Sequence, residues 1–180
     1  LTMDYGKYQY KVICEDKAHY HFVRGWLEKK GGHRRVSCWG KLPHSGSGKK
    51  FVQKNFDEAF QKVRQLSSRA KTFLIVIVDA DNLSIDEMLS TFDNREEDFV
   101  FIIIAKWSID TWARFLTDPE SSEDRLDESK SYKMKYRENT KFTQLGKQLA
   151  DMEMTSSSAF PASLWSSYTR VKDKKKFLKL

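Results

Sequence analysis

The chain has 180 residues, of which 39% are hydrophobic and 13% aromatic, a content that supports one folded core and excludes a disordered chain. Its formal net charge of +7 favours a polyanionic partner such as nucleic acid. No apolar run approaches the ~18 residues that cross a bilayer, and the first residues lack a signal-peptide pattern. We therefore expect a cytoplasmic protein without a membrane partner, in which Cys14 and Cys38 are buried free thiols.

The first 70 residues predict two strands and two helices. Residues 8–14 (YQYKVIC) become apolar toward their end, and residues 18–30 repeat apolar side chains at helical spacing. The glycine-, serine- and lysine-rich stretch Gly40–Lys50 predicts a loop. The expected elements are the strand Tyr8–Cys14, the helix Ala18–Lys30, the strand Val36–Trp39 and the helix Phe51–Arg69.

The stretch Phe73–Asp81 (FLIVIVDAD) predicts the central strand of a sheet. Its unbroken run of apolar residues, rich in Ile and Val, is typical of a strand buried on both faces. A short helix, Ser84–Phe92, follows with a capping-box pattern, and then come the strand Phe99–Ala105 and the helix Ile109–Leu116. Strands that alternate with helices in this way predict an α/β three-layer sandwich with a mainly parallel central sheet.

The chain changes character after Leu116. Residues 117–141 are almost entirely polar and charged, which indicates a surface excursion. Residues 142–154 carry apolar side chains at helical spacing, and residues 162–180 predict a strongly basic final helix or tail. We therefore divide the chain into an α/β core (residues 1–116), a charged excursion (117–141) and a basic helical C-terminal element (142–180).

Carboxylates follow three of the predicted strands. Glu15 follows the first strand, Asp79 and Asp81 the third, and Asp110 lies just past the fourth. We expect them to converge, because the carboxyl ends of parallel strands meet at one edge of a sheet. Clustered carboxylates repel one another unless a divalent cation neutralises them, and Mg²⁺ and Mn²⁺ prefer oxygen ligands. Such a site suits phosphoryl transfer. The alternative for Asp79 and Asp81 is an ordinary strand-to-helix turn, with Asp81 or Ser84 as the helix N-cap.

Three segments resemble the Toprim domain of topoisomerases, DnaG-type primases and OLD-family nucleases. Residues 10–32 (YKVICEDKAHYHFVRGWLEKKGG) are similar to its opening, where a glutamate follows the first strand. Residues 73–82 (FLIVIVDADN) resemble its Asp-x-Asp motif. Residues 101–116 (FIIIAKWSIDTWARFL) are similar to a segment of OLD-like and RloB-like proteins in which an acidic residue precedes an aromatic in a helix. The resemblance covers roughly residues 8–116, and this compact form is similar to small Toprim subunits of phage-defence systems.

The resemblance implies a metal-dependent nuclease in antiviral defence. Glu15, Asp79 and Asp81 would bind Mg²⁺ or Mn²⁺ directly or through water, Asp110 would complete a second site, and Glu15 would double as the base that activates water. The resemblance also implies a larger assembly, with an ATPase partner subunit and possible oligomerisation. Two residues depart from the family's pattern, because Asp16 replaces a common glycine and Asp110 a usual glutamate. Either departure implies an altered metal geometry or a weakened enzyme.

Lysines accompany the predicted site. Gly46–Lys50 (GSGKK) follows a strand and precedes a helix, so its amides and lysines are suited to bind phosphate. The stretch is not a Walker A motif, and a plain surface loop is the alternative of equal weight. We expect Lys49, Lys50 and Lys106 to neutralise phosphate charge in the transition state.

Other residues with chemical potential give weaker signals. The His and Cys residues between positions 14 and 38 match no zinc-site spacing. Tryptophans are more often part of a core than base-stacking platforms, but Trp39 and Trp107 lie at predicted strand ends near the site.

The function predicted from the sequence is metal-dependent cleavage of phosphodiester bonds in DNA or RNA. The first alternative is a catalytically inactive Toprim-like module that binds nucleic acid or a protein partner. A phosphatase or nucleotide hydrolase that uses the same metals is the second alternative.

Overall fold

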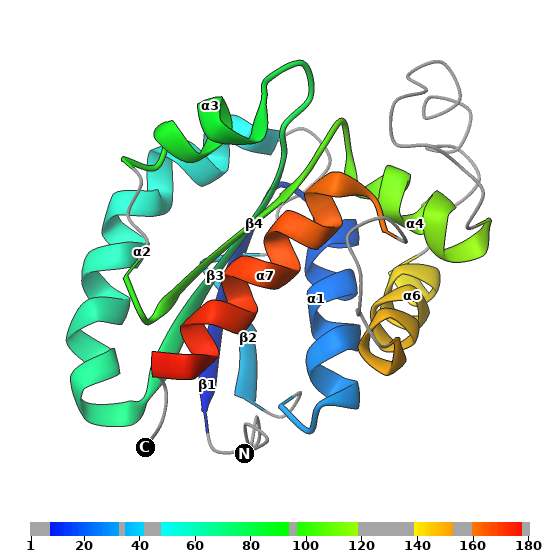
Figure 1. Ribbon diagram of the computed structural model, residues 1–180. Coiled ribbons are helices and arrows are strands. Elements are labelled where there is room, and N and C mark those ends of the chain that lie inside the picture. Colours follow the sequence, from blue (N-terminus) through cyan, green and yellow to red (C-terminus); the bar gives the residue numbers. More distant parts are fainter. Residues whose placement is uncertain are drawn as a thin grey trace.

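Four parallel strands form the centre of the molecule, in the order β2-β1-β3-β4 (Figure 1). The computed structural model describes residues 8–32, 35–41, 48–93, 97–118, 139–152 and 160–177, without the side chains of residues 68–70, 139–140 and 172–177. All strand pairs are parallel, and the register of β3 with β4 runs from Leu74↔Val100 to Asp79↔Ala105. The strands are β1 (Gln9–Cys14), β2 (Val36–Cys38), β3 (Thr72–Asp79) and β4 (Val100–Ala105).

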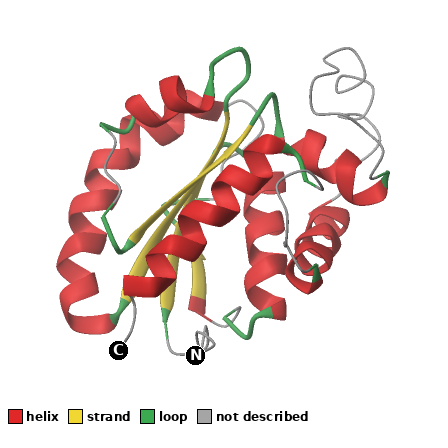
Figure 2. Ribbon diagram, in the orientation of Figure 1, coloured by secondary structure: helices red, strands yellow, loops and turns green. Residues whose placement is uncertain are grey.

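Helices cover both faces of this sheet (Figure 2), which confirms the predicted α/β three-layer sandwich. On one face lie α1 (Lys17–Lys29), α4 (Ile109–Thr117), α6 (Asn139–Asp151) and α7 (Ala162–Phe177). On the other face lie α2 (Gly48–Ala70) and α3 (Ile85–Ser90). Among the described residues no helix is long and apolar enough to cross a membrane.

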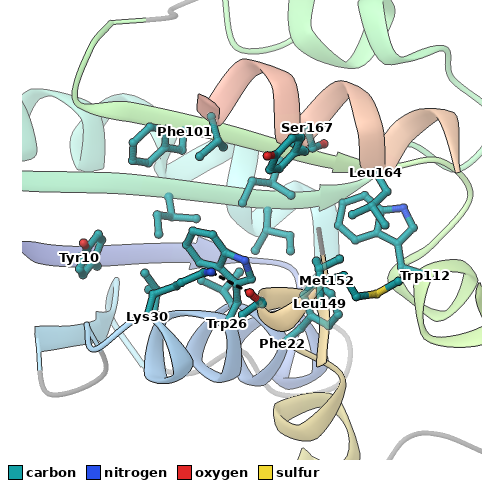
Figure 3. Close-up of a pocket in the computed structure, with 18 residues that line it drawn as sticks. Tyr10, Phe22, Trp26, Lys30, Phe101, Trp112, Leu149, Met152, Leu164 and Ser167 are labelled. Carbon is teal, nitrogen blue, oxygen red and sulfur yellow. Dashed lines mark hydrogen bonds between the residues drawn. The ribbon is translucent and has the colours of Figure 1, made fainter. Parts of the chain in front are cut away.

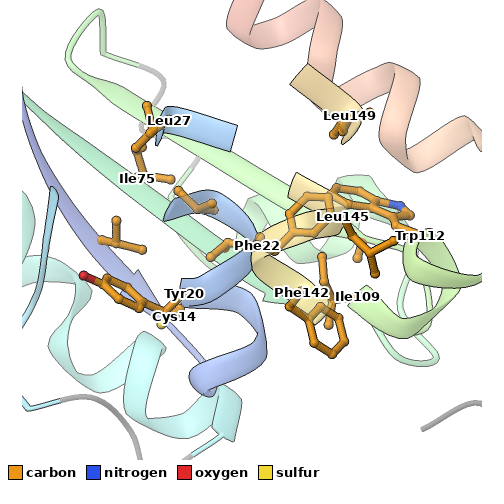
Figure 4. Close-up of a cluster of buried hydrophobic side chains, with 14 of the residues drawn as sticks. Cys14, Tyr20, Phe22, Leu27, Ile75, Ile109, Trp112, Phe142, Leu145 and Leu149 are labelled. Carbon is orange, nitrogen blue, oxygen red and sulfur yellow. The ribbon is translucent and has the colours of Figure 1, made fainter. Parts of the chain in front are cut away.

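The central strand β3 is buried along its whole length. Its residues alternate between the two layers, because successive side chains of a strand point to opposite faces. Ile75 (Figure 4) and Ile77 enter the core beneath α1, α4 and α6. Val76 and Val78 enter the core beneath α2 and α3. This double burial is the physical reason for the unbroken apolar run in the sequence.

Helix starts follow the local sequence signals. Ser84 caps α3 with the predicted capping box: its Oγ accepts from Glu87 N at 3.1 Å, and its own N donates to Glu87 Oε2 at 2.7 Å. One prediction is corrected. Helix α2 begins at Gly48, so Lys49 and Lys50 lie in its first turn and are not part of a loop. Gly40 and Lys41 lie outside the helices and strands, and residues 42–47 of the predicted loop lie outside the described residues.

The C-terminal helices pack on the sheet and its covering helices. Helix α7 lies over the edge strand β4, where Ser167 Oγ accepts from Ile104 N at 3.2 Å and donates to Ile104 O at 3.3 Å. Helix α6 packs on α1 and adds Phe142 and Leu145 to the core. Most of the predicted excursion, residues 119–138, lies outside the described residues. The division at residues 116 and 142 stays a prediction, but both C-terminal helices share one core with the sheet.

Two glycines allow α1 and α6 to cross in backbone contact. A Cβ atom at Gly25 would collide with the carbonyl oxygen of Thr143, and one at Gly146 would collide with that of Phe22. Both obstacles are helix backbone, so neither can rotate away as a side chain does. The interface therefore requires a residue without a side chain at both positions.

We expect Gly146→Ala to destabilise the fold by about 2 kcal/mol or more, because the two helices must separate to admit the methyl group. In an open helix position the same change stabilises by about 1 kcal/mol, so the sign of the effect is diagnostic. The measurement is the free energy of unfolding in urea. Gln144→Ala, at an exposed position of the same helix, is the matched control and should change that free energy by less than about 0.5 kcal/mol. A stabilised Gly146→Ala would contradict the close crossing.

Candidate functional site

The candidate site lies where the sheet changes its direction of growth. From β1 the chain passes through α1 to β2 on one side, and α2 on the opposite face then carries it to β3 on the other side. The carboxyl ends of β1 and β3 therefore flank the crevice in which open α/β sheets bind ligands. Glu15 and Asp16 directly follow β1, and Asp79 is the last residue of β3. The predicted convergence of Glu15 and Asp79 is thus a consequence of the strand order.

Glu15 contacts the end of β3 directly. Its Oε1 accepts a hydrogen bond of 2.8 Å from the backbone N of Asp79. Burial raises the pKa of Glu15, and the nearby carboxylate of Asp79 raises it further, to about 7. Attraction by His19 and Lys49 and the hydrogen bond from Asp79 N oppose this rise without cancelling it. Glu15 therefore titrates near neutral pH.

Asp79 is buried, with 6% of its surface exposed. Its Oδ1 accepts hydrogen bonds from His19 Nε2 at 2.9 Å and from Ile109 N at 2.7 Å. The second bond stabilises the N-terminus of α4, whose N-cap residue Ser108 makes no side-chain capping bond within the described part of the chain. One carboxylate thus joins β3 to α1 and to α4.

His19 lies between two carboxylates and is 1% exposed. Its Nδ1 contacts Asp16 Oδ1 at 2.8 Å, and its Nε2 contacts Asp79 Oδ1 at 2.9 Å. Burial alone lowers the pKa of His19, but the charge of Asp79 and the hydrogen bonds to both aspartates outweigh it and hold the pKa well above its usual range. The same pairing lowers the pKa of Asp16 to about 2 against the effect of burial. His19 is therefore an imidazolium that donates from both ring nitrogens.

Asp81 lies at the solvent-exposed rim. Its Oδ2 accepts from Lys49 Nζ at 2.6 Å, and its side chain is 57% exposed. Its backbone has a positive φ of 50° and forms an isolated antiparallel bridge with Trp107, whose φ is 66°. The structure thus pairs Asp81 with a lysine and links the loops that follow β3 and β4.

The remaining predicted residues are spread around this edge. Asp110 is 5% exposed and lies in the first turn of α4, the helix that Asp79 caps. Lys106 follows β4, and its Nζ lies 5.6 Å from the centroid of the Trp107 ring. Lys50 is exposed in the first turn of α2, next to Lys49. Of the three lysines expected to bind phosphate, Lys49 directly contacts one of the expected metal ligands, Asp81.

Carboxylate oxygens are suitable ligands for a hard cation, but the carboxylates at this edge do not form a complete metal site. Within the described residues no group of three or more His, Cys, Asp and Glu side chains is arranged to hold a metal ion. Mg²⁺ nevertheless binds commonly through one or two carboxylates together with phosphate oxygens of the substrate. Glu15 and Asp79 supply two such carboxylates, and their mutual repulsion is what a cation would relieve. The donor set therefore fits Mg²⁺ or Mn²⁺ at Glu15 and Asp79.

Sequence reasoning missed the roles of Asp16 and His19. Asp16 is the N-cap of α1, because its Oδ1 also accepts from His19 N at 3.2 Å. An aspartate before a helical pattern is a recognisable cap signal. The contact of His19 with Asp79 spans 60 residues and has no local signal in the sequence.

A separate apolar pocket of about 190 Å³ lies between the sheet and helices α1, α6 and α7 (Figure 3). Lys30 forms part of its wall and donates from Nζ to Ala150 O at 2.7 Å. Its walls carry none of the predicted site residues, so the pocket plays no part in the chemistry of the sheet edge. They are mainly aromatic and aliphatic and include Tyr10, Phe22, Trp26, Phe101, Trp112 and Leu164.

The chain matches no family model, no curated protein and no solved structure in the comparisons with known proteins.

We expect Glu15→Gln to stabilise the protein at pH 8 and to leave its stability unchanged at pH 4. The pKa of Glu15 is about 7 in the folded protein against an ordinary value of 4.5, so its ionisation costs stability as the pH rises from 4.5 through 7. Glutamine keeps the acceptor for Asp79 N and removes the charge. With its partial exposure taken into account, the gain at pH 8 is about 2 kcal/mol, or roughly 4 to 8 °C in melting temperature.

The matched control for this experiment is Glu87→Gln. Glu87 is exposed, and its backbone hydrogen bond with Ser84 lowers its pKa, so removal of its charge should not stabilise the protein at either pH. Equal melting temperatures of the parent and Glu15→Gln at pH 8 would contradict the close approach of Glu15 and Asp79.

Proposed function

We propose that the chain is a Toprim-type, metal-dependent nuclease that cleaves phosphodiester bonds of nucleic acid. The observation that carries this proposal is the meeting of Glu15 and Asp79 at the switch point of the sheet, through the 2.8 Å hydrogen bond between Glu15 Oε1 and Asp79 N. A partly buried carboxylate whose pKa is about 7, placed beside a second carboxylate, is typical of a catalytic or cation-binding group.

Mg²⁺ or Mn²⁺ would be held by Glu15 and Asp79, with Asp81 as a further ligand once it leaves Lys49. The cation would act as a Lewis acid toward the phosphate and lower the pKa of a bound water. Asp79 Oδ1 accepts from His19 and Ile109, so Asp79 would hold the cation while it keeps these two bonds. The buried Asp110 lies behind this edge on α4, and we keep it as a candidate for a second metal site.

The chain's own residues supply the proton transfer and the phosphate contacts. Glu15 would also take a proton from the attacking water, the role that the Toprim resemblance implies for it. His19 fixes the orientation of Asp79 from the protein interior through the contact between its Nε2 and Asp79 Oδ1. Lys49, at 2.6 Å from Asp81, would exchange this carboxylate for a phosphate oxygen of the substrate and so neutralise charge in the transition state. Lys50 and Lys106 would supply further positive charge for the phosphates on either side.

The partners follow from charge and from the proposed family. The net charge of +7 supports binding of DNA or RNA. We also propose a cytoplasmic location and a larger defence-type assembly with an ATPase partner subunit. The location rests on the free thiols of Cys14 and Cys38, and the assembly rests on the Toprim resemblance.

A catalytically inactive binding module is the second candidate, and one observation favours it. Both aspartates of the Asp-x-Asp motif already have a cationic partner, because His19 contacts Asp79 at 2.9 Å and Lys49 contacts Asp81 at 2.6 Å. Such a site is stable without a metal and retains exposed lysines for nucleic acid.

Asp81→Asn should lower the rate of cleavage of labelled DNA and RNA in Mg²⁺ or Mn²⁺ by about 100-fold or more. The melting temperature without metal should change little. Asp81 is exposed and its pair with Lys49 is on the surface, so its loss costs little stability. The rise in melting temperature that metal gives the parent should also shrink, because a ligand stabilises only the fold that binds it. Oligonucleotides and mononucleotides are assayed in parallel, since preference for mononucleotides would indicate a phosphatase or nucleotide hydrolase.

The matched control is Asp151→Asn. Asp151 is also an exposed aspartate paired with a lysine, since its Oδ2 lies 3.0 Å from Lys29 Nζ, but it belongs to α6 and not to the candidate site. The control variant should cleave as the parent does. Full cleavage by Asp81→Asn would contradict the catalytic role, and salt-sensitive binding without cleavage by the parent would favour the inactive module. Asp79→Asn is a poorer test, because Asp79 also caps α4 and contacts the His19 imidazolium, and its loss is expected to destabilise the fold.

A further inference from the structure

Trp107 lies beside the carboxylates at the same edge of the sheet. It follows β4, the neighbour of β3, and its backbone forms the isolated bridge with Asp81. Neighbouring strands are about 5 Å apart, so Trp107 is within reach of a nucleotide whose phosphate lies at Glu15 and Asp79. Lys106 Nζ lies 5.6 Å from the ring centroid. An aromatic ring, an ammonium group and the candidate cleavage site thus meet at one place.

The fold gains little from a tryptophan at this position. All five tryptophans lie in the described part of the chain. Four of them are buried in the core or pack against it, whereas Trp107 belongs to neither core cluster. The four are Trp26, Trp39, Trp112 and Trp165.

Trp107 also carries two local costs. Its φ of 66° is in the left-handed region, which disfavours every residue with a large side chain. Its indole Nε1–H is buried without an acceptor in the described residues, whereas Trp112 Nε1 donates to Ser163 Oγ at 2.9 Å. Glycine would avoid both costs. A bulky aromatic retained in a strained backbone at a candidate site points to a ligand contact and not to packing.

We propose that Trp107 is a stacking surface for a nucleobase of single-stranded nucleic acid. The inference rests on the proposed function, because it places the phosphate of the stacked nucleotide at the Glu15–Asp79 site. Any base with a free face can stack on an aromatic side chain. Bases of single strands have such a face, whereas bases inside a duplex are covered by their neighbours. Lys106, whose Nζ lies over the Trp107 ring, and Lys49, which contacts Asp81, would bind the adjoining phosphates.

The test compares two single strands of about eight nucleotides: an oligothymidylate and an abasic strand with the same number of phosphates. Affinity is measured by fluorescence anisotropy at low salt with Ca²⁺ in place of Mg²⁺ or Mn²⁺, so that a divalent cation stays at the carboxylates while cleavage is suppressed. Trp107→Gly removes the ring and keeps the backbone conformation. We expect it to lower the affinity for oligothymidylate roughly tenfold, about the contribution of one stacked base, and to leave the affinity for the abasic strand unchanged.

Two further variants make the result specific. Trp107→Phe retains a stacking ring and should keep most of the affinity for oligothymidylate. Trp39→Leu is the matched control, because Trp39 also lies at a strand end under a lysine, with Lys62 Nζ 5.5 Å from its ring, but packs against the core beneath α2. This variant should bind both strands as the parent does. The parent's own preference for oligothymidylate over the abasic strand gives a readout that needs no variant.

The outcomes separate this inference from the proposed function. An equal loss of affinity for both strands in Trp107→Gly, or no preference of the parent for oligothymidylate, would overturn the stacking role and leave the nuclease proposal standing. The expected binding pattern in a parent that never cleaves would support stacking and overturn the nuclease. Absence of binding to either strand would overturn both.

Discussion

The buried contact between Asp79 and His19 is the interaction on which the arrangement of the sheet edge depends. A carboxylate with 6% exposure is costly in isolation, because burial disfavours its charged form. Here the His19 imidazolium and the backbone N–H of Ile109 satisfy Asp79 Oδ1. Asp79 thereby sets the direction in which α4 leaves the sheet and the face that α1 turns toward β3.

This arrangement leaves an excess of negative charge at the edge. Asp16 and Asp79 share the single positive charge of His19, and Glu15 lies next to them at the partly exposed side. Burial, together with this uncompensated negative charge, raises the pKa of Glu15 to about 7. A cation arriving from solvent would meet Glu15 first. The buried side of the edge is thus paired internally, and its unpaired negative charge lies at the partly exposed side.

At the rim of the site, two residues with strained backbone are held by a contact between their main chains and not by packing against the core. Asp81 and Trp107 both have positive φ values and hold each other through an isolated bridge. Neither residue gains stability from the core to offset this conformation. In contrast, the α1–α6 interface uses Gly25 and Gly146 to bring two helices into backbone contact. The molecule therefore combines a tightly packed body with a strained edge.

The local sequence determined the elements and much of the edge. The apolar run of β3, the capping box at Ser84 and the helical spacing of α1 are signals within a few residues, because they reflect backbone geometry and burial of a single element. From these signals the parallel sheet follows, and with it the meeting of Glu15 and Asp79. The start of α2 at Gly48 could not be predicted in this way, because glycine and serine next to lysine are typical of a loop.

Only the tertiary structure decided how charges pair across the edge. Nothing in the sequence around His19 indicates Asp79, 60 residues away, and nothing around Lys49 indicates Asp81, 32 residues away. Likewise, the sequence gives no reason why Trp107 lies outside the core when the other tryptophans contribute to it. Such contacts depend on the order of the strands and on the direction in which each following loop turns. These are properties of the whole packed chain, because a side chain's partners are set by distances in space and not by its neighbours in sequence.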